Sequence, residues 1–184
     1  MKRCLDIILS LIGLTVLAPA MFGVALAIWL EDRGPILFRQ IRVGRKGRLF
    51  KIYKFRSMVV NADKKGGYST AAGDPRITST GRFIRRTSID ELPQLLNVLK
   101  GEMSIVGPRP DVPAQESNYS AGDWQLRLSV RPGLTGLAQA SKRSMATAEE
   151  RTAMDLTYAH SASLWFDIKI ILMTIRQITR KAGN

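Results

Sequence analysis

The sequence has few of the side chains that most often attack an electrophile. Its 184 residues contain one cysteine, Cys4, and one histidine, His160. A single thiol permits no intramolecular disulfide, which fits a reducing compartment. No cluster of Cys and His at zinc-binding spacing is present. We find neither an internal repeat nor a low-complexity segment, so the length predicts one domain with a hydrophobic core of its own.

Acidic residues are also scarce. The chain has 15 Asp and Glu against 28 Lys and Arg, which gives a formal net charge of +13. Such an excess indicates an anionic partner, which can be nucleic acid, anionic lipid or a phosphorylated substrate. Thiol and imidazole groups are nearly absent, and a carboxylate placed beside arginines suits chemistry on a phosphate.

One long segment lacks charge altogether. Ile7 to Leu30 carries no ionisable side chain, and a straight helix of that length would run roughly 36 Å, enough to span a bilayer. A signal peptide is the first alternative, because basic Lys2 and Arg3 precede the run. The run is long for a signal peptide, and the residues 31–33 that follow it make a poor cleavage site.

Pro19 divides this apolar segment. Its ring and missing N–H predict a kink that leaves two halves of about 18 Å, each too short to cross a core of about 30 Å. Residues 33–56 carry nine basic residues and no acidic one, so both flanks favour the cytoplasmic face. These points favour a re-entrant helix-break-helix, and a kinked spanning helix remains the alternative. We expect Asp6 to cap this helix or to pair with Lys2 or Arg3.

The rest of the chain predicts an α+β fold that is mostly helical. A β-hairpin is expected from strands at 36–43 and 49–55 around a turn at 44–47. Helices are expected at 80–86, 92–99, 111–130 with a break near 120, 148–162 and 164–178. The last is apolar and interrupted by charges, which suits either a helix lying in the membrane interface or an ordinary core helix. We therefore expect a re-entrant anchor over 1–32 and a catalytic domain over 33–184, joined as one unit.

Asp90 and Glu91 form the pair of carboxylates with the clearest chemical potential. Ser88 to Glu91 matches a capping box, which is a purely structural interpretation. Pro93 argues for a helix start at or near Asp90, since proline is harmless only in the first turn. There the helix end would keep Asp90 ionised and hold a phosphate, as aspartyl-phosphate chemistry requires. Glu91 would then be the available ligand for Mg²⁺ on a nucleotide diphosphate.

Arginines accompany the two carboxylates. Arg82, Arg85 and Arg86 precede them and can equally be a solvated face. Arg109 lies between two prolines that fix its backbone, and its guanidinium suits bidentate phosphate contact. Arg131, before Pro132, repeats this pattern less strongly.

Five motifs in a fixed order carry a resemblance to a known family. They are Lys-Phe-Arg-Ser-Met at 54–58, the run around Asp90 at 88–95, Leu-Lys-Gly-Glu-Met-Ser at 99–104, Val-Gly-Pro-Arg-Pro at 106–110 and Arg-Pro-Gly-Leu-Thr-Gly at 131–136. Together they resemble the bacterial sugar transferase family, the monotopic phosphoglycosyl transferases, in its minimal catalytic form. The resemblance covers essentially the whole chain.

The resemblance implies transfer of a phospho-sugar from a UDP-sugar to undecaprenyl phosphate, with release of UMP and assistance from Mg²⁺. It makes Asp90 the nucleophile of a ping-pong cycle and Glu91 the metal ligand. It implies phosphate or nucleotide contacts from Arg85 and Arg109, with Lys54, Arg56, Arg131 and Asp155 as further substrate-binding candidates. It also implies a re-entrant helix broken at Pro19, on the cytoplasmic face of the bacterial inner membrane and in contact with its inner leaflet.

Three departures from the family pattern leave the donor sugar open. The break is Ala18-Pro19 rather than Ser-Pro, residues 141–145 lack Gly-Arg-Asn, and residues 160–163 lack the usual asparagine. The alternatives are a membrane-tethered nucleic-acid binder, a membrane-bound phosphohydrolase and a catalytically silent scaffold. We expect no nucleic-acid partner, because no recognised motif for one is present, and we note a homodimer as a possible assembly.

Overall fold

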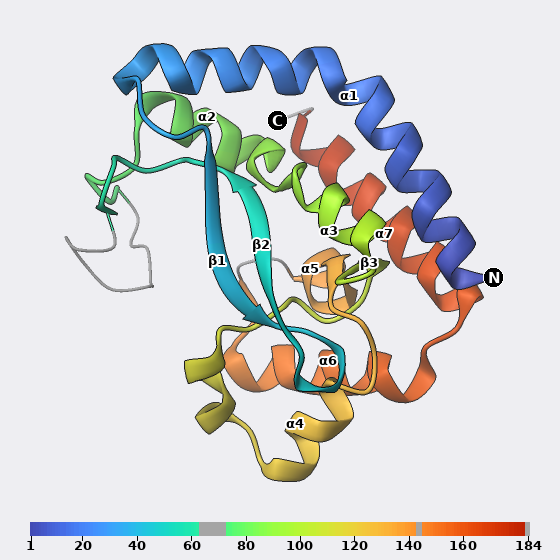
Figure 1. Cartoon of the computed structure of the whole chain (residues 1–184). Coiled ribbons are helices and arrows are strands. Elements are labelled where there is room, and N and C mark those ends of the chain that lie inside the picture. Colours follow the sequence, from blue (N-terminus) through green and yellow to red (C-terminus); the bar gives the residue numbers. More distant parts are fainter. Residues whose placement is uncertain (63–72, 143–144, 183–184) are drawn as a thin grey trace.

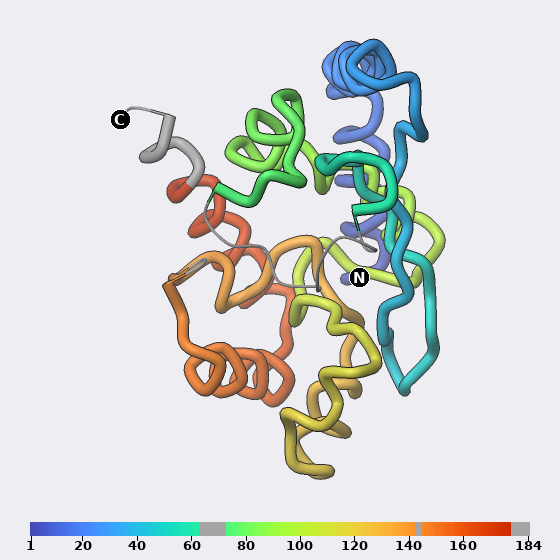
Figure 2. Tube along the Cα trace, turned by 90° about the vertical axis from the view of Figure 1, so that its left-hand side faces the viewer, coloured from blue at the N-terminus to red at the C-terminus, as the bar shows by residue number. Residues whose placement is uncertain are grey.

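The computed structural model describes residues 1–62, 73–142 and 145–182. Part of the departure at 141–145 therefore lies outside the described residues. The fold is mostly helical with two small sheets, which confirms the predicted class. From the side, α1 and the hairpin lie on one flank, and the orange and red C-terminal helices lie on the other (Figure 2).

The apolar N-terminal segment forms one helix, α1 (Lys2–Asp32), with Pro19 inside it. Figure 1 shows α1 bending into two arms along the outside of the molecule, as a proline without its N–H predicts. The expected helix-break-helix is thus a bend within a continuous helix. It is the one helix among the described residues that is long and apolar enough to cross a membrane, and only 6% of its most apolar window is buried.

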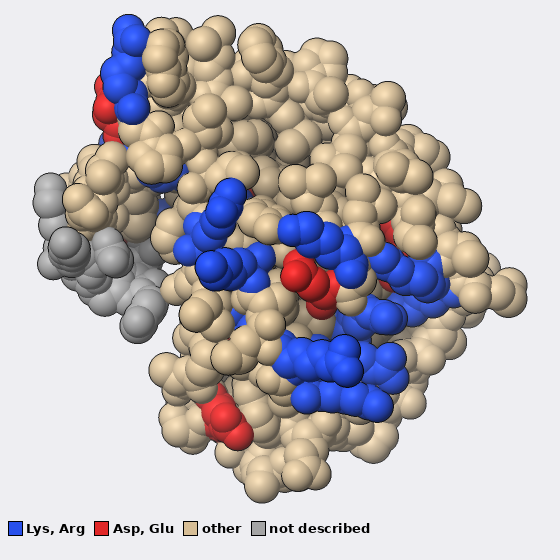
Figure 3. Space-filling view, in the orientation of Figure 1, with Lys and Arg blue, Asp and Glu red and all other residues tan. Residues whose placement is uncertain are grey.

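The predicted hairpin is confirmed. Strands β1 (Leu37–Val43) and β2 (Leu49–Phe55) pair antiparallel in the register Leu37 with Phe55 to Val43 with Leu49. A 3-10 turn, η1 (Arg45–Gly47), joins them, with Lys46 at φ 58°. Figure 3 shows Lys and Arg side chains gathered over this region. The exposed basic residues of the hairpin are Arg39, Arg45, Lys46, Arg48 and Lys51.

Three short elements lead through the centre of the molecule. Helix α2 (Ser79–Thr87) begins at Thr78, whose hydroxyl accepts from the Gly81 N–H. The 3-10 turn η3 (Ile89–Glu91) and helix α3 (Gln94–Lys100) follow. Helix α3 ends at Gly101 with φ 80°, a left-handed position that favours glycine. The inner face of the hairpin packs on α3 through Phe50, Ile52, Val98 and Met103.

A second sheet pairs β3 (Ser104–Val106) with β4 (Gly133–Thr135) in parallel. The segments just after β3 and just before β4 approach so closely that a Cβ on Gly107 would lie 2.2 Å from the Arg131 carbonyl oxygen. The two Pro/Gly turns that the sequence singles out, at 107–110 and 131–136, therefore lie side by side. Nothing local in either segment indicates this pairing.

The C-terminal half surrounds that small sheet. Its elements are η4 (Pro113–Asn118), α4 (Ala121–Arg127), α5 (Leu137–Ser141), α6 (Ala148–Ser161) and α7 (Leu164–Ala182). The predicted break near residue 120 separates η4 from α4, and the two C-terminal helices are confirmed. Val106, Tyr158 and Ile170 join β3, α6 and α7 in one buried cluster.

Asp6 has neither of the roles we expected. It is 2% exposed, and its carboxylate accepts hydrogen bonds from the Ser104 hydroxyl at 2.9 Å and the Ile105 N–H at 2.9 Å. The prediction was wrong because both donors are about a hundred residues away in the sequence. These hydrogen bonds to Asp6 therefore hold α1 against the start of β3.

Candidate active site

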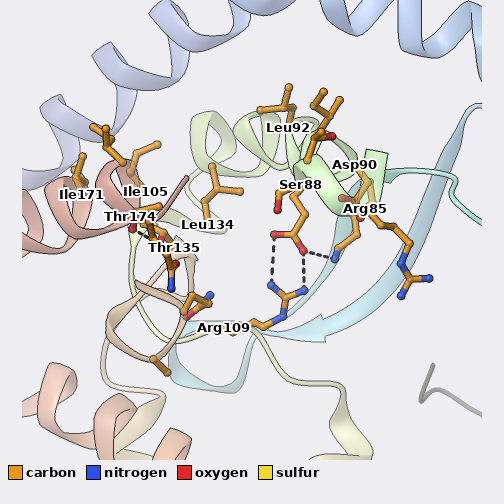
Figure 4. A pocket seen from close by; sticks show the side chains of 18 of the residues that line it. Arg85, Ser88, Asp90, Leu92, Ile105, Arg109, Leu134, Thr135, Ile171 and Thr174 are labelled. Atoms are coloured by element: carbon orange, nitrogen blue, oxygen red, sulfur yellow. Dashed lines mark hydrogen bonds and ion pairs between the residues drawn. The ribbon is translucent and has the colours of Figure 1, made fainter. Parts of the chain in front are cut away.

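Six charged side chains line one pocket, and five of them are residues that the sequence singles out. Lys54 comes from the end of β2, Arg85 from the last turn of α2, Asp90 and Glu91 from η3, and Arg109 from the turn after β3. The pocket has a volume of about 740 Å³, which lies in the usual range for a small-molecule site. Figure 4 shows Arg85, Asp90 and Arg109 on the same side of it.

The backbone around the two carboxylates differs from both of our expectations. Ser88 ends α2 in a left-handed conformation, φ 61°, and its side chain caps nothing in η3, so no capping box forms. Helix α3 begins after Pro93, so Asp90 lies in the preceding 3-10 turn and not at the mouth of that helix. The reason is that Pro93 has no N–H with which to continue an α-helical ladder from Ile89.

Glu91 is the centre of a charged cluster. Its Oε1 accepts from Lys54 Nζ at 2.7 Å and from Arg109 Nη2 at 2.7 Å, while Arg109 Nη1 lies 3.4 Å from Oε2 (Figure 4). Burial alone would raise the pKa of Glu91, but the charges of Arg109 and Lys54 lower it to about 2. Glu91 is therefore ionised throughout the physiological range, and its orientation is fixed.

Asp90 is held quite differently. It is 9% exposed and has no hydrogen bond or ion pair to any residue in the described part of the chain. Burial raises its pKa to about 6; the Lys54 charge opposes this shift and the Glu91 charge adds to it. Our expectation that the local backbone keeps this carboxylate ionised was therefore too simple, because desolvation dominates. At pH 7 the carboxylate form still predominates.

Three other predicted residues lie outside the pocket. Arg56 forms an ion pair with Asp32 at the end of α1. Arg131 donates from Nε to the Gly101 carbonyl at 3.0 Å. Asp155 is 1% exposed and pairs with Arg127 Nη2 at 3.0 Å. Each has a protein partner in this arrangement, and the structure does not bring them to Asp90.

Arg127 is an important side chain that the sequence did not indicate. It is 4% exposed, pairs with Asp111 at 2.9 Å as well as with Asp155, and donates to the backbone carbonyl of Arg109. Tyr119 donates its hydroxyl to Asp111 at 2.8 Å and lies against the Arg127 guanidinium. Arg127 thus supports the turn that presents Arg109 to Glu91. No local pattern distinguishes it from a surface arginine at the end of a helix.

The pocket also has a wall that the sequence did not indicate. Thr135, Gln139, Arg151 and Thr174 contribute to its lining from β4, α5, α6 and α7. Apolar side chains complete it, among them Ile105, Leu134, Ile171 and Ile175. These residues come together only through the parallel β3–β4 pairing and the packing of α7 behind it.

The donor set fits a magnesium ion bound together with a phosphorylated ligand. No group of three or more His, Cys, Asp or Glu residues that could hold a metal occurs in residues 1–62, 73–142 and 145–182. Mg²⁺, however, commonly uses one or two carboxylates and takes its other oxygens from phosphate and water. Among the described residues, Oε2 of Glu91 has only the long 3.4 Å contact with Arg109, so this oxygen retains lone-pair capacity for a cation.

The fold and the site define a class: a protein with an exposed apolar helix and a buried carboxylate pair among cationic side chains suited to phosphate. A family model described as bacterial sugar transferase matches residues 1–181. The chain belongs to this family.

Named relatives agree with the family. The chain is 43% identical, over 95% of its length, to the UDP-glucose:undecaprenyl-phosphate glucose-1-phosphate transferase of Escherichia coli K12. It is 40% identical over its whole length to the undecaprenyl-phosphate galactose phosphotransferase of Salmonella typhimurium LT2. It is 43% identical over its whole length to the exopolysaccharide production protein PSS of Rhizobium leguminosarum bv. phaseoli. The chain spans 39% of the E. coli relative, 41% of the Salmonella relative and 98% of the Rhizobium relative.

Proposed function

We propose that this chain is a phosphoglycosyl transferase that moves a phospho-sugar from a UDP-sugar to undecaprenyl phosphate and releases UMP. This would be the first membrane step of glycoconjugate assembly. The observation that carries the proposal is Asp90, a buried carboxylate with no partner among the described residues, beside a Glu91 fixed by Lys54 and Arg109. A nucleophile needs this freedom, whereas a structural carboxylate would be bonded.

The reaction divides into two displacements at the same phosphorus. An oxygen of Asp90 attacks the phosphorus that bears the sugar, and the bond from that phosphorus to the oxygen shared with UMP breaks. UMP leaves with the bonding electrons, and an aspartyl phospho-sugar remains. A phosphate oxygen of undecaprenyl phosphate then attacks this phosphorus, which releases the Asp90 carboxylate and forms the lipid diphosphate sugar.

The cationic residues of the pocket have distinct roles in this scheme. Arg109 and Lys54 orient Glu91 and lie where they can offset charge on the two phosphates. Arg85 lines the same pocket and is suited to the departing UMP. Glu91 would hold Mg²⁺ through Oε2; when bound, the ion neutralises phosphate charge and so favours attack by an anionic carboxylate.

The geometry of α1 supports a re-entrant anchor. At its start, Lys2 Nζ bonds Asp167 at 2.5 Å, and Arg3 donates to the carbonyls of Val98 and Leu99. At its end, Asp32 pairs with Arg56. Both ends are therefore attached to the same body, and a bend at Pro19 lets the apolar middle dip into a bilayer and return. The location we propose is the cytoplasmic face of the bacterial inner membrane, in its inner leaflet.

The donor sugar is not fixed by the relatives, since their names specify glucose in one and galactose in another. The direct test is UMP release from a panel of UDP-sugars with Mg²⁺, with and without undecaprenyl phosphate. We expect release that depends on the lipid with one donor. Release of UMP with free sugar phosphate and no lipid requirement would instead indicate a phosphohydrolase. No release across the panel from folded, membrane-bound protein would contradict the proposal.

A further inference from the structure

The pocket has two chemically different sides. One carries the charged cluster around Asp90, and the other is built from β3, β4 and α7. Figure 4 shows Ile105, Leu134 and Ile171 grouped on that second side, across the pocket from Arg85 and Asp90. Together with Ile175 they line the same cavity. We call these four residues the apolar wall.

Two hydroxyls next to the apolar wall form their hydrogen bonds within the protein. The hydroxyls of Thr135 and Thr174 lie 2.8 Å apart and bond each other, and Thr174 also donates to the Ile170 carbonyl at 2.9 Å. These two hydroxyls therefore need no hydrogen bond from a ligand. Gln139 on α5 also lines the pocket, and its amide oxygen and nitrogen are buried without a partner among the described residues. The surface suited to hydrocarbon is therefore limited to the four side chains of the apolar wall.

The apolar wall continues onto the outside of the molecule. Ile175 lines the pocket and is also 52% exposed. Leu172, at 60%, and Ile168, at 36%, lie one and two turns earlier on the same face of α7. An apolar stripe thus runs along α7 to the pocket mouth at Ile175. Trp165, 77% exposed, lies at its far end.

We propose that the apolar wall receives the first isoprene units of the lipid acceptor, with Ile175 at the point of entry. The inference rests on the proposed function and deepens it. An acceptor whose hydrocarbon chain lies in the bilayer must place its phosphate within reach of Asp90, so the units nearest the phosphate have to leave the bilayer. The apolar wall holds these first units, and the stripe on α7 gives the units that follow them a continuous apolar surface back to the bilayer. The nucleotide sugar has no comparable hydrocarbon, and it uses the charged side.

A two-step reaction allows the acceptor site to be tested separately from the donor site. The first step, measured as a phospho-sugar adduct on the protein without lipid, reports on donor binding alone. The second step, measured with geranyl phosphate in detergent micelles, involves two isoprene units and no bilayer. For Ile175→Asn we expect the KM for geranyl phosphate to rise about tenfold, the effect of losing one or two buried methylene contacts. The rate of adduct formation should stay within about twofold of the wild type.

Leu172→Asn is the matched control. Leu172 lies on the same stripe and is as exposed, but it does not line the pocket. We expect this variant to keep the wild-type KM for geranyl phosphate. Ile175→Ala, which favours the helix, provides a second test if the asparagine variant does not fold.

Each outcome bears on a different claim. An equal rise in KM for both asparagine variants would overturn the inference, since the stripe would then act only by general association with micelles. Slower adduct formation in Ile175→Asn would overturn it too, by assigning the apolar wall to the nucleotide sugar. An unchanged KM in an otherwise active Ile175 variant would overturn the inference alone. Wild-type protein without adduct or lipid-dependent UMP release would overturn the proposed function and the inference with it.

Discussion

Asp90 and Glu91 are neighbours in the chain, yet their surroundings drive their pKa values in opposite directions. Both are desolvated, but only Glu91 has cations in direct contact, at 2.7 Å. Its pKa falls to about 2, while that of Asp90 rises to about 6. Two carboxylates with separated pKa values can divide the chemistry between them. Glu91 is suited to remain a negative charge in a fixed orientation, and Asp90 is suited to form a covalent bond to phosphorus.

Replacing Asp90 by asparagine tests the nucleophile assignment. An amide has nearly the same shape and leaves no charge unpaired, so we expect a folded protein without turnover. Loss of a covalent nucleophile should reduce the rate by on the order of 10³-fold or more. Intact-mass measurement after incubation with the UDP-sugar should detect a phospho-sugar adduct on the wild type and none on Asp90→Asn. A fully active variant would rule out Asp90 as the nucleophile.

The raised pKa of Asp90 predicts an acid limit on the first step. Only the carboxylate attacks, so adduct formation should increase with pH through about 6 and level off above it. Burial raises this pKa and the Lys54 charge holds it down, so Lys54→Met should move the acid limb to higher pH. The measurement is kcat/KM for the UDP-sugar against pH.

Lys51→Met is the control for that experiment. Lys51 lies three residues earlier on β2, is exposed and is not part of the pocket. Its loss should leave the acid limb in place, although it removes the same charge from the same strand. A wild-type profile that stays flat down to pH 5 would show that ionisation of Asp90 does not limit attack.

At the scale of elements, the turn that carries Arg109 depends on a buried ionic cluster. Arg127 at the end of α4 contacts Asp111 just after this turn and Asp155 on α6. Charges so far from solvent are stable only while all partners are present. The cluster therefore links three elements and fixes the backbone from which Arg109 reaches Glu91.

Arg127→Leu should destabilise the fold strongly. It leaves two buried carboxylates without their cation, and removal of one partner of a buried ion pair costs about 3–5 kcal/mol. Chemical unfolding in detergent, followed by circular dichroism, measures the loss. Arg45→Leu is the comparison, because Arg45 is exposed and makes one bond to the Ser129 carbonyl; its effect should stay within about 0.5 kcal/mol. Similar stability for the two variants would mean that the cluster is not needed.

The elements that could be predicted from the sequence are those made by local signals. Alternation of apolar and polar residues predicts the hairpin. Helix α6 begins at a capping box of Thr147 with Glu150 in the structure, which is a local signal of the same kind. What could not be predicted depends on contacts between distant segments. The parallel pairing of β3 with β4 joins two short strands that have no distinctive local pattern. The backbone donor that bonds Asp6 belongs to Ile105, far away in the sequence.

The candidate site divides in the same way. Asp90 and Glu91 could be selected because the scarce acidic residues stand here next to arginines and a helix start, and Arg109 because two prolines flank it. Arg127 and the apolar wall could not, because an arginine at a helix end and isoleucines in an apolar helix have ordinary local explanations. Only the tertiary structure shows that Arg127 supports the Arg109 turn and that these isoleucines line the pocket. Asp155 was selected by resemblance, and the structure gives it a buried partner instead of a place in the pocket.

For the molecule as a whole, the proposed re-entrant course of α1 would determine how the site meets the membrane. Its exposed large apolar residues are Ile8, Leu11, Ile12, Val16, Phe22, Leu26, Trp29 and Leu30. An exposed apolar surface of this extent marks contact with a membrane or with a partner protein, while both helix ends are bonded to the body that holds Asp90. A re-entrant course satisfies both conditions, whereas a span would separate Lys2 from Asp167 by the thickness of a bilayer.

The single cysteine makes this topology directly measurable. Cys4 is exposed and lies next to the bonded start of α1. In a re-entrant arrangement a membrane-impermeant maleimide should label Cys4 in inverted inner-membrane vesicles and not in right-side-out vesicles. The double variant Cys4→Ser, Arg45→Cys reports the side of the hairpin, and it should be labelled in the same vesicles as the wild type. Labelling of these two positions from opposite faces would establish a kinked spanning helix, and the contacts of Lys2 and Arg3 with the catalytic body could not then exist in the membrane.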